Sequence, residues 1–280
     1  MNIQTAINIA SRKLKAKDFL TPLLDCELIM SKVIDKEREF LILNSDLKLR
    51  NRESAQFNKL INERLSGKPI AYLTGKKYFW NYEFKINENV LIPRPDTELL
   101  VEEVLKVYKS KEKINFLEVG IGSGCISLSI LKEKKNFFAT GIDISNYCIN
   151  ACEINARDLD VKSRIKLFKS DIDNFNKGKY DLVISNPPYI KKLDLQYLEK
   201  DILNFEPKIA LDGGLDGTSE IRKLIKKTSE LIKTNGKLIF EIAFDQTKKV
   251  KSILNDHGFY INAVVKDLAK NDRCIISTKK

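Results

Sequence analysis

The chain has 280 residues, of which 43% are hydrophobic and 31% are charged. This balance is typical of a folded protein with an ample core, and the length suits two domains. No apolar run reaches the roughly 18 residues that a membrane-spanning helix needs, and the N-terminus predicts an amphipathic helix instead of a signal peptide. We therefore expect a cytoplasmic protein that has no membrane partner.

The formal net charge of +11 raises the question of a nucleic-acid partner. Only 10 of the 49 basic residues are arginine, and the lysines are spread along the whole chain. Phosphate and base recognition favours clustered arginine. We therefore interpret the charge as solvated surface and expect no stable nucleic-acid partner. The alternative is a role that involves nucleic acid or proximity to the ribosome.

Cysteine and histidine usage limits the chemistry further. The chain has five scattered cysteines and a single histidine, His257. Such cysteines indicate a reducing compartment without disulfides, and one histidine nearly excludes a histidine-based triad or metal site. Cys148 and Cys152 share a helix face, but no nearby ligand completes a metal site, so we expect buried thiols and no metal.

Residues 1–70 predict a small helical domain. Apolar residues recur at helical spacing from Phe57 to Leu65, and Gly67 follows as a stop signal. Residues 71–96 have a different character and predict a β-hairpin linker with aromatic strands. The linker ends in a rigid, extended Ile-Pro-Arg-Pro run.

Residues 97–280 alternate between strand and helix patterns. Helical patterns begin at Thr97, Ser123, Ser145 and Ser219, and strand patterns cover 115–119, 137–142, 164–169, 180–185 and 237–242. One more helix and two more strands follow. This alternation predicts an α/β fold with a doubly wound parallel sheet, which binds ligands beyond the carboxyl ends of its strands.

The first of these strands runs into LEVGIGSGC at 117–125. Gly120, Gly122 and Gly124 are spaced so that the backbone can approach a ligand closely. The spacing is neither that of the phosphate loop nor that of the dinucleotide fingerprint. Glu118, beside this turn, would repel a phosphate but attract the cationic amino group of an amino-acid-like ligand.

Two further acids follow strand ends at the same edge of the sheet. Asp143 lies 19 residues after Gly124, where a carboxylate can accept hydrogen bonds from both ribose hydroxyls. Asp171 follows the third strand and is placed to meet an adenine amino group. Together with Glu118, these residues describe a nucleoside that carries an amino acid. We therefore predict S-adenosylmethionine as the cofactor, with a nicotinamide dinucleotide as the alternative.

The fourth strand delivers the motif Asn186-Pro187-Pro188-Tyr189 to that edge. Two consecutive prolines cannot continue a central strand. The Asn186 side-chain oxygen and the Pro187 carbonyl are adjacent acceptors that match both hydrogens of a planar –NH₂ group, and Tyr189 offers an aromatic face. We predict that this motif holds a planar nitrogen toward the methyl donor. A plain turn that ends a strand is the alternative.

The chemistry explains why two acceptors are needed. An amide nitrogen is a poor nucleophile because its lone pair is delocalised into the carbonyl group. Acceptors on its hydrogens localise the lone pair and stabilise the developing positive charge. The residues alone do not decide which nitrogen is methylated: adenine N6, cytosine N4, guanine N2 or glutamine N5. A cofactor-binding module without activity is a further alternative, although Asn186 is intact.

Several segments of the sequence carry a resemblance to one family. They are PIAYLTG at 69–75, FW at 79–80, LIPRPDTE at 91–98, the glycine loop, NPPY at 186–189, EP at 206–207 with ALDGGLDG at 210–217, and DLAKNDR at 267–273. Over nearly its whole length the chain resembles the bacterial release factor glutamine methyltransferases. NPPY is shared with nucleic-acid enzymes, whereas LIPRPDTE after a helical N-terminal domain is far more specific.

The resemblance implies a class I methyltransferase domain over 97–280, joined by the hairpin to the helical domain. It implies methylation, from S-adenosylmethionine, of N5 of the glutamine in the Gly-Gly-Gln motif of peptide chain release factors, which the N-terminal helices would dock. An amino group of DNA or RNA, or a ribosomal-protein glutamine, is the alternative substrate. We expect a monomer.

The resemblance also assigns residues to roles. Cofactor contacts fall on Gly120, Ile121, Gly122, Ser123, Gly124, Asp143 and Asn186. The hold on the substrate glutamine falls on Asn186, Pro187, Pro188 and Tyr189.

Other positions are open to more than one interpretation. The family usually has Asp and Thr where this chain has Glu118 and Ile121. It often has an aromatic residue at the position of Ile172, which here would cover adenine with an aliphatic side chain. Arg94 and Glu98 either orient the substrate or join the hairpin to the core.

Overall fold

The computed structural model describes residues 1–109 and 113–280. Contacts within the chain divide it into two compact units. The first comprises Met1–Lys76 and Glu199–Phe205, and the second comprises Lys77–Leu198 and Glu206–Lys280. Each unit encloses a hydrophobic core of its own.

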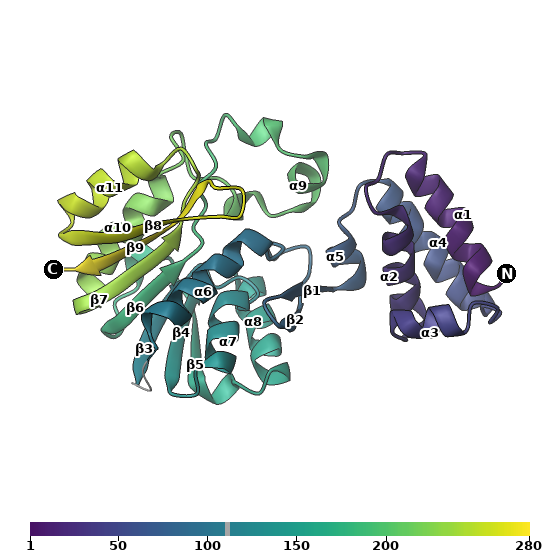
Figure 1. Ribbon diagram of the computed structural model, residues 1–280, viewed down its shortest axis with the longest axis horizontal. Coiled ribbons are helices and arrows are strands. Elements are labelled where there is room, and N and C mark those ends of the chain that lie inside the picture. Colours follow the sequence, from purple (N-terminus) through teal and green to yellow (C-terminus); the bar gives the residue numbers. More distant parts are fainter. Residues whose placement is uncertain (110–112) are drawn as a thin grey trace. The chain divides into compact units, whose positions relative to one another are not determined.

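The first unit is helical, and its N-terminal helices run from purple to blue in Figure 1. Its helices are α1 (Ile3–Lys15), α2 (Pro22–Ile34), α3 (Arg38–Leu43), α4 (Asn51–Leu65), α5 (Ile70–Thr74) and α9 (Lys200–Phe205). The apolar residues of α1 to α5 meet in one core, in which Leu14, Met30 and Phe57 are at most 1% exposed. The predicted helical N-terminal region is confirmed. No helix in the described ranges combines the length and the apolar character that crossing a bilayer requires.

Helix α5 occupies residues that we expected to belong to the hairpin segment. Pro69 precedes its first residue, and Gly75 ends it with φ 77°, a conformation that glycine adopts without a steric penalty. Tyr72 and Leu73 are buried, so this short helix packs into the protein interior ahead of the hairpin. The hairpin itself consists of β1 (Lys76–Phe79) and β2 (Tyr82–Lys85).

The turn of the hairpin is fixed by Glu98. Trp80 has φ 56°, and its backbone N–H donates to Glu98 Oε1 at 2.7 Å. The indole N–H of Trp80 donates to Glu133 at 3.0 Å, while Phe79 and Phe84 are buried in the core. Glu98 therefore joins the hairpin to helix α6 (Glu98–Val107).

The described residues of the second unit form a seven-stranded sheet. Its strands are β3 (Ile114–Val119), β4 (Phe137–Asp143), β5 (Ile165–Lys169), β6 (Tyr180–Ser185), β7 (Ile232–Glu241), β8 (Phe259–Lys266) and β9 (Asp272–Lys279). Their order is β5-β4-β3-β6-β7-β9-β8, with β3 to β7 parallel and β9 antiparallel to both of its neighbours. The order reverses between β3 and β6, where sheets of this kind bind ligands. The predicted doubly wound α/β fold is confirmed.

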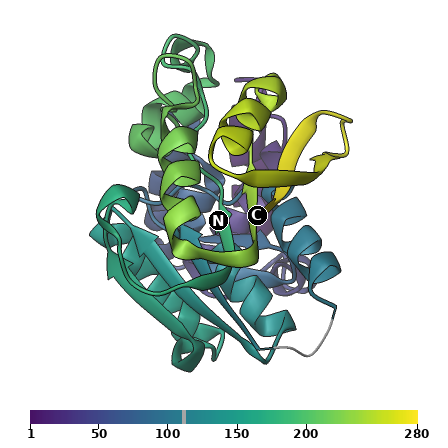
Figure 2. The ribbon, with the colours of Figure 1, turned by 90° about the vertical axis from the view of Figure 1, so that its left-hand side faces the viewer.

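Helices cover both faces of this sheet (Figure 2). On one face lie α6, α7 (Cys125–Glu133) and α8 (Asn146–Asp158), and on the other α10 (Ser219–Leu231) and α11 (Thr247–Asp256). Successive side chains of a strand point to opposite faces, so Leu182 enters one core and Val183 the other. Burial on both faces explains why the middle of β6, residues 182–184, is a continuous apolar run.

Candidate active site

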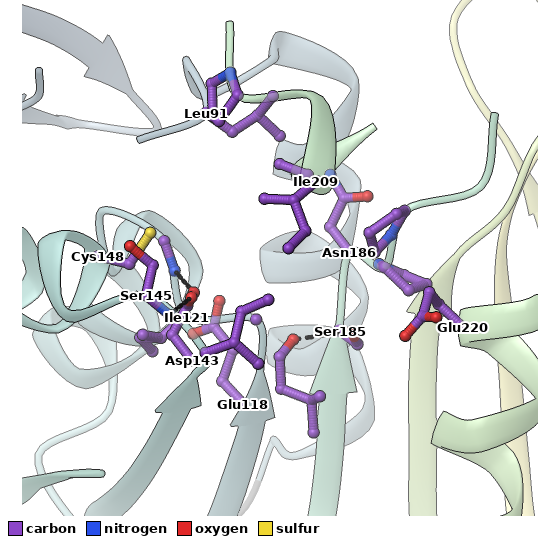
Figure 3. A pocket seen from close by; sticks show the side chains of 18 of the residues that line it. Leu91, Glu118, Ile121, Asp143, Ser145, Cys148, Ser185, Asn186, Ile209 and Glu220 are labelled. Carbon is purple, nitrogen blue, oxygen red and sulfur yellow. Dashed lines mark hydrogen bonds between the residues drawn. The ribbon is translucent and has the colours of Figure 1, made fainter. Parts of the chain in front are cut away.

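A cavity of about 710 Å³ opens at the carboxyl ends of β3, β4 and β6 (Figure 3). Its volume lies in the range of roughly 300–1,000 Å³ that is typical of small-molecule and cofactor sites. The predicted site residues that line it are Glu118, Gly120, Ile121, Gly122, Ser123, Asp143, Asp171, Ile172, Asn186, Pro187 and Pro188. Gly124 and Tyr189, which were also predicted, are not part of the lining.

The glycine-rich turn follows β3 and leads into α7. Gly120 and Gly122 have φ 73° and 54°, and a Cβ at either would meet no described atom within 4 Å. A ligand can therefore approach the backbone there. Gly124 differs, because with φ 82° its Cβ would lie 2.6 Å from Cys152 Sγ. Gly124 thus allows α7 to begin close against α8.

Glu118 lies at the end of β3 and is 1% exposed. Its Oε2 accepts a hydrogen bond of 2.9 Å from the backbone N–H of Ser127, in the first turn of α7. Burial raises the pKa of Glu118 to about 8; hydrogen bonds from Ser127 oppose this rise, and the nearby Asp143 carboxylate adds to it slightly. A buried acid of this kind ionises when a cation is brought next to it.

Asp143, at the end of β4, holds the glycine turn in place. Its Oδ2 accepts from Gly122 N at 3.0 Å and its Oδ1 from Ser145 N at 2.9 Å. Burial raises the pKa of Asp143, and these backbone donors oppose that rise. Figure 3 shows Asp143 and Glu118 at the ends of neighbouring strands, with Asn186 at the end of the next strand of the sheet.

Asp171 and Ile172 lie beyond the end of β5. Asp171 Oδ1 accepts from the backbone N–H of Asp173 at 2.9 Å and so caps a short 3₁₀ turn, Ile172–Asn174. Ile172 is 7% exposed and lines the cavity. The structure thus brings both residues to the same cavity as Asp143.

The Asn186 amide belongs to a hydrogen-bonded chain of side chains. Its Nδ2 donates to Thr97 Oγ1 at 3.0 Å, and Thr97 Oγ1 donates to Glu241 Oε2 at 2.7 Å. The Tyr189 hydroxyl donates to the other carboxylate oxygen, Glu241 Oε1, at 2.9 Å. The chain joins the end of β6 to the end of β7 and to the segment before α6.

Sequence reasoning missed Thr97 and Glu241 as site residues. Thr97 lies within LIPRPDTE, a segment that carried the resemblance, but its role there was not identified. Glu241 is a carboxylate at the carboxyl end of an apolar strand, like Glu118 and Asp143. The same rule that selected those two acids would have found it.

The backbone after the NPPY motif is supported by the glycine-rich ALDGGLDG segment. The ladders of β6 with β3 and β7 end at Ser185, and the chain then pairs elsewhere. Ile190 N donates to Leu211 O at 3.1 Å, and Gly213 N donates to Ile190 O at 2.8 Å. A Cβ at Gly213 would lie 2.8 Å from the Cα and carbonyl carbon of Tyr189, so only glycine fits there.

Arg94 connects the hairpin linker to the segment that carries Glu206. Its Nη2 lies 2.5 Å from Glu206 Oε1, and Glu206 Oε2 accepts from Ile92 N at 3.3 Å. Glu206 is 6% exposed, whereas Arg94 lines the cavity. This ion pair joins the LIPRP segment, which contains Arg94, to the EP segment, which contains Glu206.

Comparisons with known proteins agree with this architecture. The protein family described as PrmC N-terminal domain matches residues 5–75, and the family described as Methyltransferase small domain matches residues 95–206. A release factor glutamine methyltransferase from Clostridium botulinum is 36% identical over 91% of this chain and 92% of that protein. A bifunctional methyltransferase from Rickettsia conorii is 34% identical over 98% of this chain and 57% of that protein.

The fold also occurs among solved structures. A ribosomal protein L11 methylase from Lactobacillus delbrueckii superposes with a TM-score of 0.52 at 19% identity, and the match covers 73% of this chain and 90% of that one. At this level of identity, the similarity shows only that the two chains share a fold.

The sheet order, the glycine-rich turn and the acids at the strand ends define a class I methyltransferase domain. The relatives that match along nearly their whole length go further, since the chain covers 99% of one from Clostridium acetobutylicum at 34% identity. The chain belongs to the release factor glutamine methyltransferase family. It spans 54–58% of the length of the similar bifunctional methyltransferases from Rickettsia.

The contact at Gly213 predicts a local defect when a methyl group is added. Gly213→Ala is expected to lower the free energy of unfolding by roughly 1–3 kcal/mol, because the new Cβ overlaps the Tyr189 backbone. Hydrogen exchange at the Ile190 amide should accelerate. Leu215→Ala, at a residue of the same segment that is 80% exposed, is the control and should change neither quantity. Unaltered Ile190 protection in Gly213→Ala would contradict the prediction.

Proposed function

We propose that this protein transfers a methyl group from S-adenosylmethionine to N5 of the glutamine in the Gly-Gly-Gln motif of peptide chain release factors. The observation that carries the proposal is that one cavity unites two kinds of group. Glu118 and Asp143 supply carboxylates at the ends of β3 and β4, and Asn186 with Pro187 supplies acceptors after β6. Family membership supports glutamine as the methylated residue.

The edge formed by β3, β4 and β5 fits the cofactor. The glycine-rich turn leaves room for a ligand against the backbone. Glu118 suits the ammonium group of the cofactor, Asp143 its ribose hydroxyls, and Asp171 with Ile172 its adenine. When bound, S-adenosylmethionine supplies an electrophilic methyl group.

Asn186 and Pro187 prepare the substrate nitrogen. The Asn186 side-chain oxygen and the Pro187 carbonyl accept its two hydrogens, which localises the lone pair and stabilises the positive charge that develops on nitrogen. Holding the two reactants in place contributes at most about 7–11 kcal/mol. No side chain has to remove a proton beforehand, because the nitrogen becomes acidic only once it is methylated.

The protein partner is a release factor, and we assign its docking to the helical unit. That unit exposes Leu20, Ile42 and Leu43, which are 97%, 69% and 82% accessible and suit contact with another protein. The five cysteines are all free and buried, which supports a reducing compartment such as the cytoplasm.

A labelling experiment tests the function directly. The protein is incubated with labelled S-adenosylmethionine and, in separate reactions, a release factor, its Gly-Gly-Gln glutamine-to-alanine variant, a ribosomal fraction, DNA and RNA. We expect label on the wild-type factor alone. Equal labelling of the alanine variant would overturn the proposal, and so would labelling of nucleic acid or of a ribosomal protein in its place.

Asn186→Ala is expected to lower turnover by roughly 100-fold or more, because one of the two acceptors on the reacting nitrogen is lost. Cofactor affinity should weaken only in part, because Glu118 and Asp143 remain. Steady-state kinetics and calorimetric binding separate the two effects. The matched control is Asn262→Ala, at an exposed position on edge strand β8. Near-normal turnover in Asn186→Ala would rule out the proposed hold on the amide.

Cofactor binding at neutral pH is expected to release a proton. Below its pKa of about 8, Glu118 is mostly protonated in the free protein, and an adjacent ammonium group drives its ionisation. Calorimetry at pH 7 in buffers of different ionisation enthalpy measures this release, which should approach one proton per site. Glu118→Gln keeps an oxygen for the Ser127 N–H but cannot ionise, so its binding should release almost none. Equal release by both proteins would show that Glu118 is not the partner of the ammonium group.

A further inference from the structure

Asn186 can serve the proposed reaction only if its side chain presents oxygen, and not –NH₂, to the substrate. The two ends of a side-chain amide are almost identical in shape but opposite in hydrogen bonding. If the amide turned over, Asn186 would offer a donor to the donor groups of the substrate. One of the two acceptors would then be lost, so something has to fix the orientation.

The chain of hydrogen bonds through Thr97 fixes it. An ionised carboxylate only accepts hydrogen bonds, and Glu241 accepts one from the Thr97 hydroxyl at 2.7 Å. That hydroxyl has a single hydrogen, so toward Asn186 the Thr97 oxygen can only accept. Asn186 must therefore turn its Nδ2 toward Thr97, 3.0 Å away, and keep Oδ1 on its other side.

Two hydroxyl groups contact the buried carboxylate of Glu241, one at each oxygen. Glu241 is 2% exposed and Thr97 is 3% exposed. Burial raises the pKa of Glu241, whereas the hydroxyls of Thr97 and Tyr189 and the positive charge of Arg273 favour ionisation. Burial and the Glu241 carboxylate raise the pKa of Tyr189, so the phenol keeps its proton and donates it at 2.9 Å. Two hydroxyl donors thus converge on one carboxylate.

We infer that Glu241 and Thr97 are positioning residues for the methyl transfer proposed above. Glu241 accepts the hydrogen of the Thr97 hydroxyl, so the Thr97 oxygen can only accept from the Asn186 amide. Asn186 therefore turns its Nδ2 toward Thr97, and Oδ1 is available to the substrate nitrogen. The same carboxylate anchors the last residue of the motif through the Tyr189 hydroxyl. The inference rests on the proposed function, since it concerns the nitrogen that this function assigns to the substrate.

Substitutions at Thr97 test this role. Thr97→Val keeps the shape and removes the hydroxyl, whereas Thr97→Ser keeps the hydroxyl and removes the methyl group. Thr97→Ser and Thr97→Ala form a second pair that differs only in the hydroxyl group. The measurements are kcat and KM with a release factor, the Kd for S-adenosylmethionine, and the midpoint of thermal unfolding.

The expected order of activity is the reverse of the order that packing alone would give. Thr97→Ser should retain kcat within about 3-fold, while Thr97→Val and Thr97→Ala should lose roughly 10- to 100-fold, with the cofactor Kd unchanged within about 2-fold. Thr97→Ser loses a buried methyl group, whereas Thr97→Val leaves the Glu241 carboxylate and the Asn186 amide without their hydrogen-bond partner, so both variants are expected to lose stability. The inference is overturned if Thr97→Ser loses as much kcat as Thr97→Ala, or if Thr97→Val stays within about 3-fold of the wild type.

A readout without activity separates this inference from the proposed function. A neutron structure of the wild-type protein locates the hydrogens on the Asn186 amide. We expect them on the nitrogen that faces Thr97, and a hydrogen-bearing nitrogen facing the cavity would overturn the inference even if the release factor is methylated. A wild-type protein that leaves the release factor unlabelled would instead remove the proposed function, whatever the amide orientation.

Discussion

A single buried carboxylate, that of Glu241, fixes the hydrogen bonds of the side chains around the NPPY motif. It receives hydrogen bonds from Thr97 and Tyr189, which come from segments far apart in the chain. Because a carboxylate only accepts, both hydroxyls point toward it, and the Asn186 amide orients accordingly. The prolines of NPPY contribute by ending the strand pairing at Ser185, which leaves the motif free to face the cavity.

The segments that carry the resemblance to the family make specific contacts near Glu241 and the cavity. Within LIPRPDTE, Arg94 pairs with Glu206, Thr97 binds Asn186, and Glu98 holds the turn of the hairpin. The ALDGGLDG segment supports the backbone just after NPPY. DLAKNDR supplies Arg273, whose charge favours the ionised form of Glu241. LIPRPDTE, ALDGGLDG and DLAKNDR thus each support the NPPY motif or a residue bound to it.

Much of the fold was predictable from short stretches of sequence. Strand and helix patterns alternate along the chain, and a strand that is buried on both faces is recognisable from consecutive apolar residues. The strand order was not: β9 inserts antiparallel between β7 and β8, and no local pattern encodes which strands become neighbours. The acids at strand ends could be recognised by position, although Glu118 also caps α7, which requires knowledge of packing. Thr97 and Glu241 are separated by 144 residues, so their hydrogen bond follows only from the folded sheet.

The central claim is that Asn186 and Pro187 present two acceptors to one substrate nitrogen. The most direct test is a crystal structure of this protein with a release factor and S-adenosylhomocysteine. We predict that Asn186 Oδ1 and the Pro187 carbonyl oxygen both lie within about 3.2 Å of the nitrogen of the glutamine amide. A glutamine nitrogen that contacts neither oxygen, or an Asn186 amide that turns its own –NH₂ toward the substrate, would contradict the account.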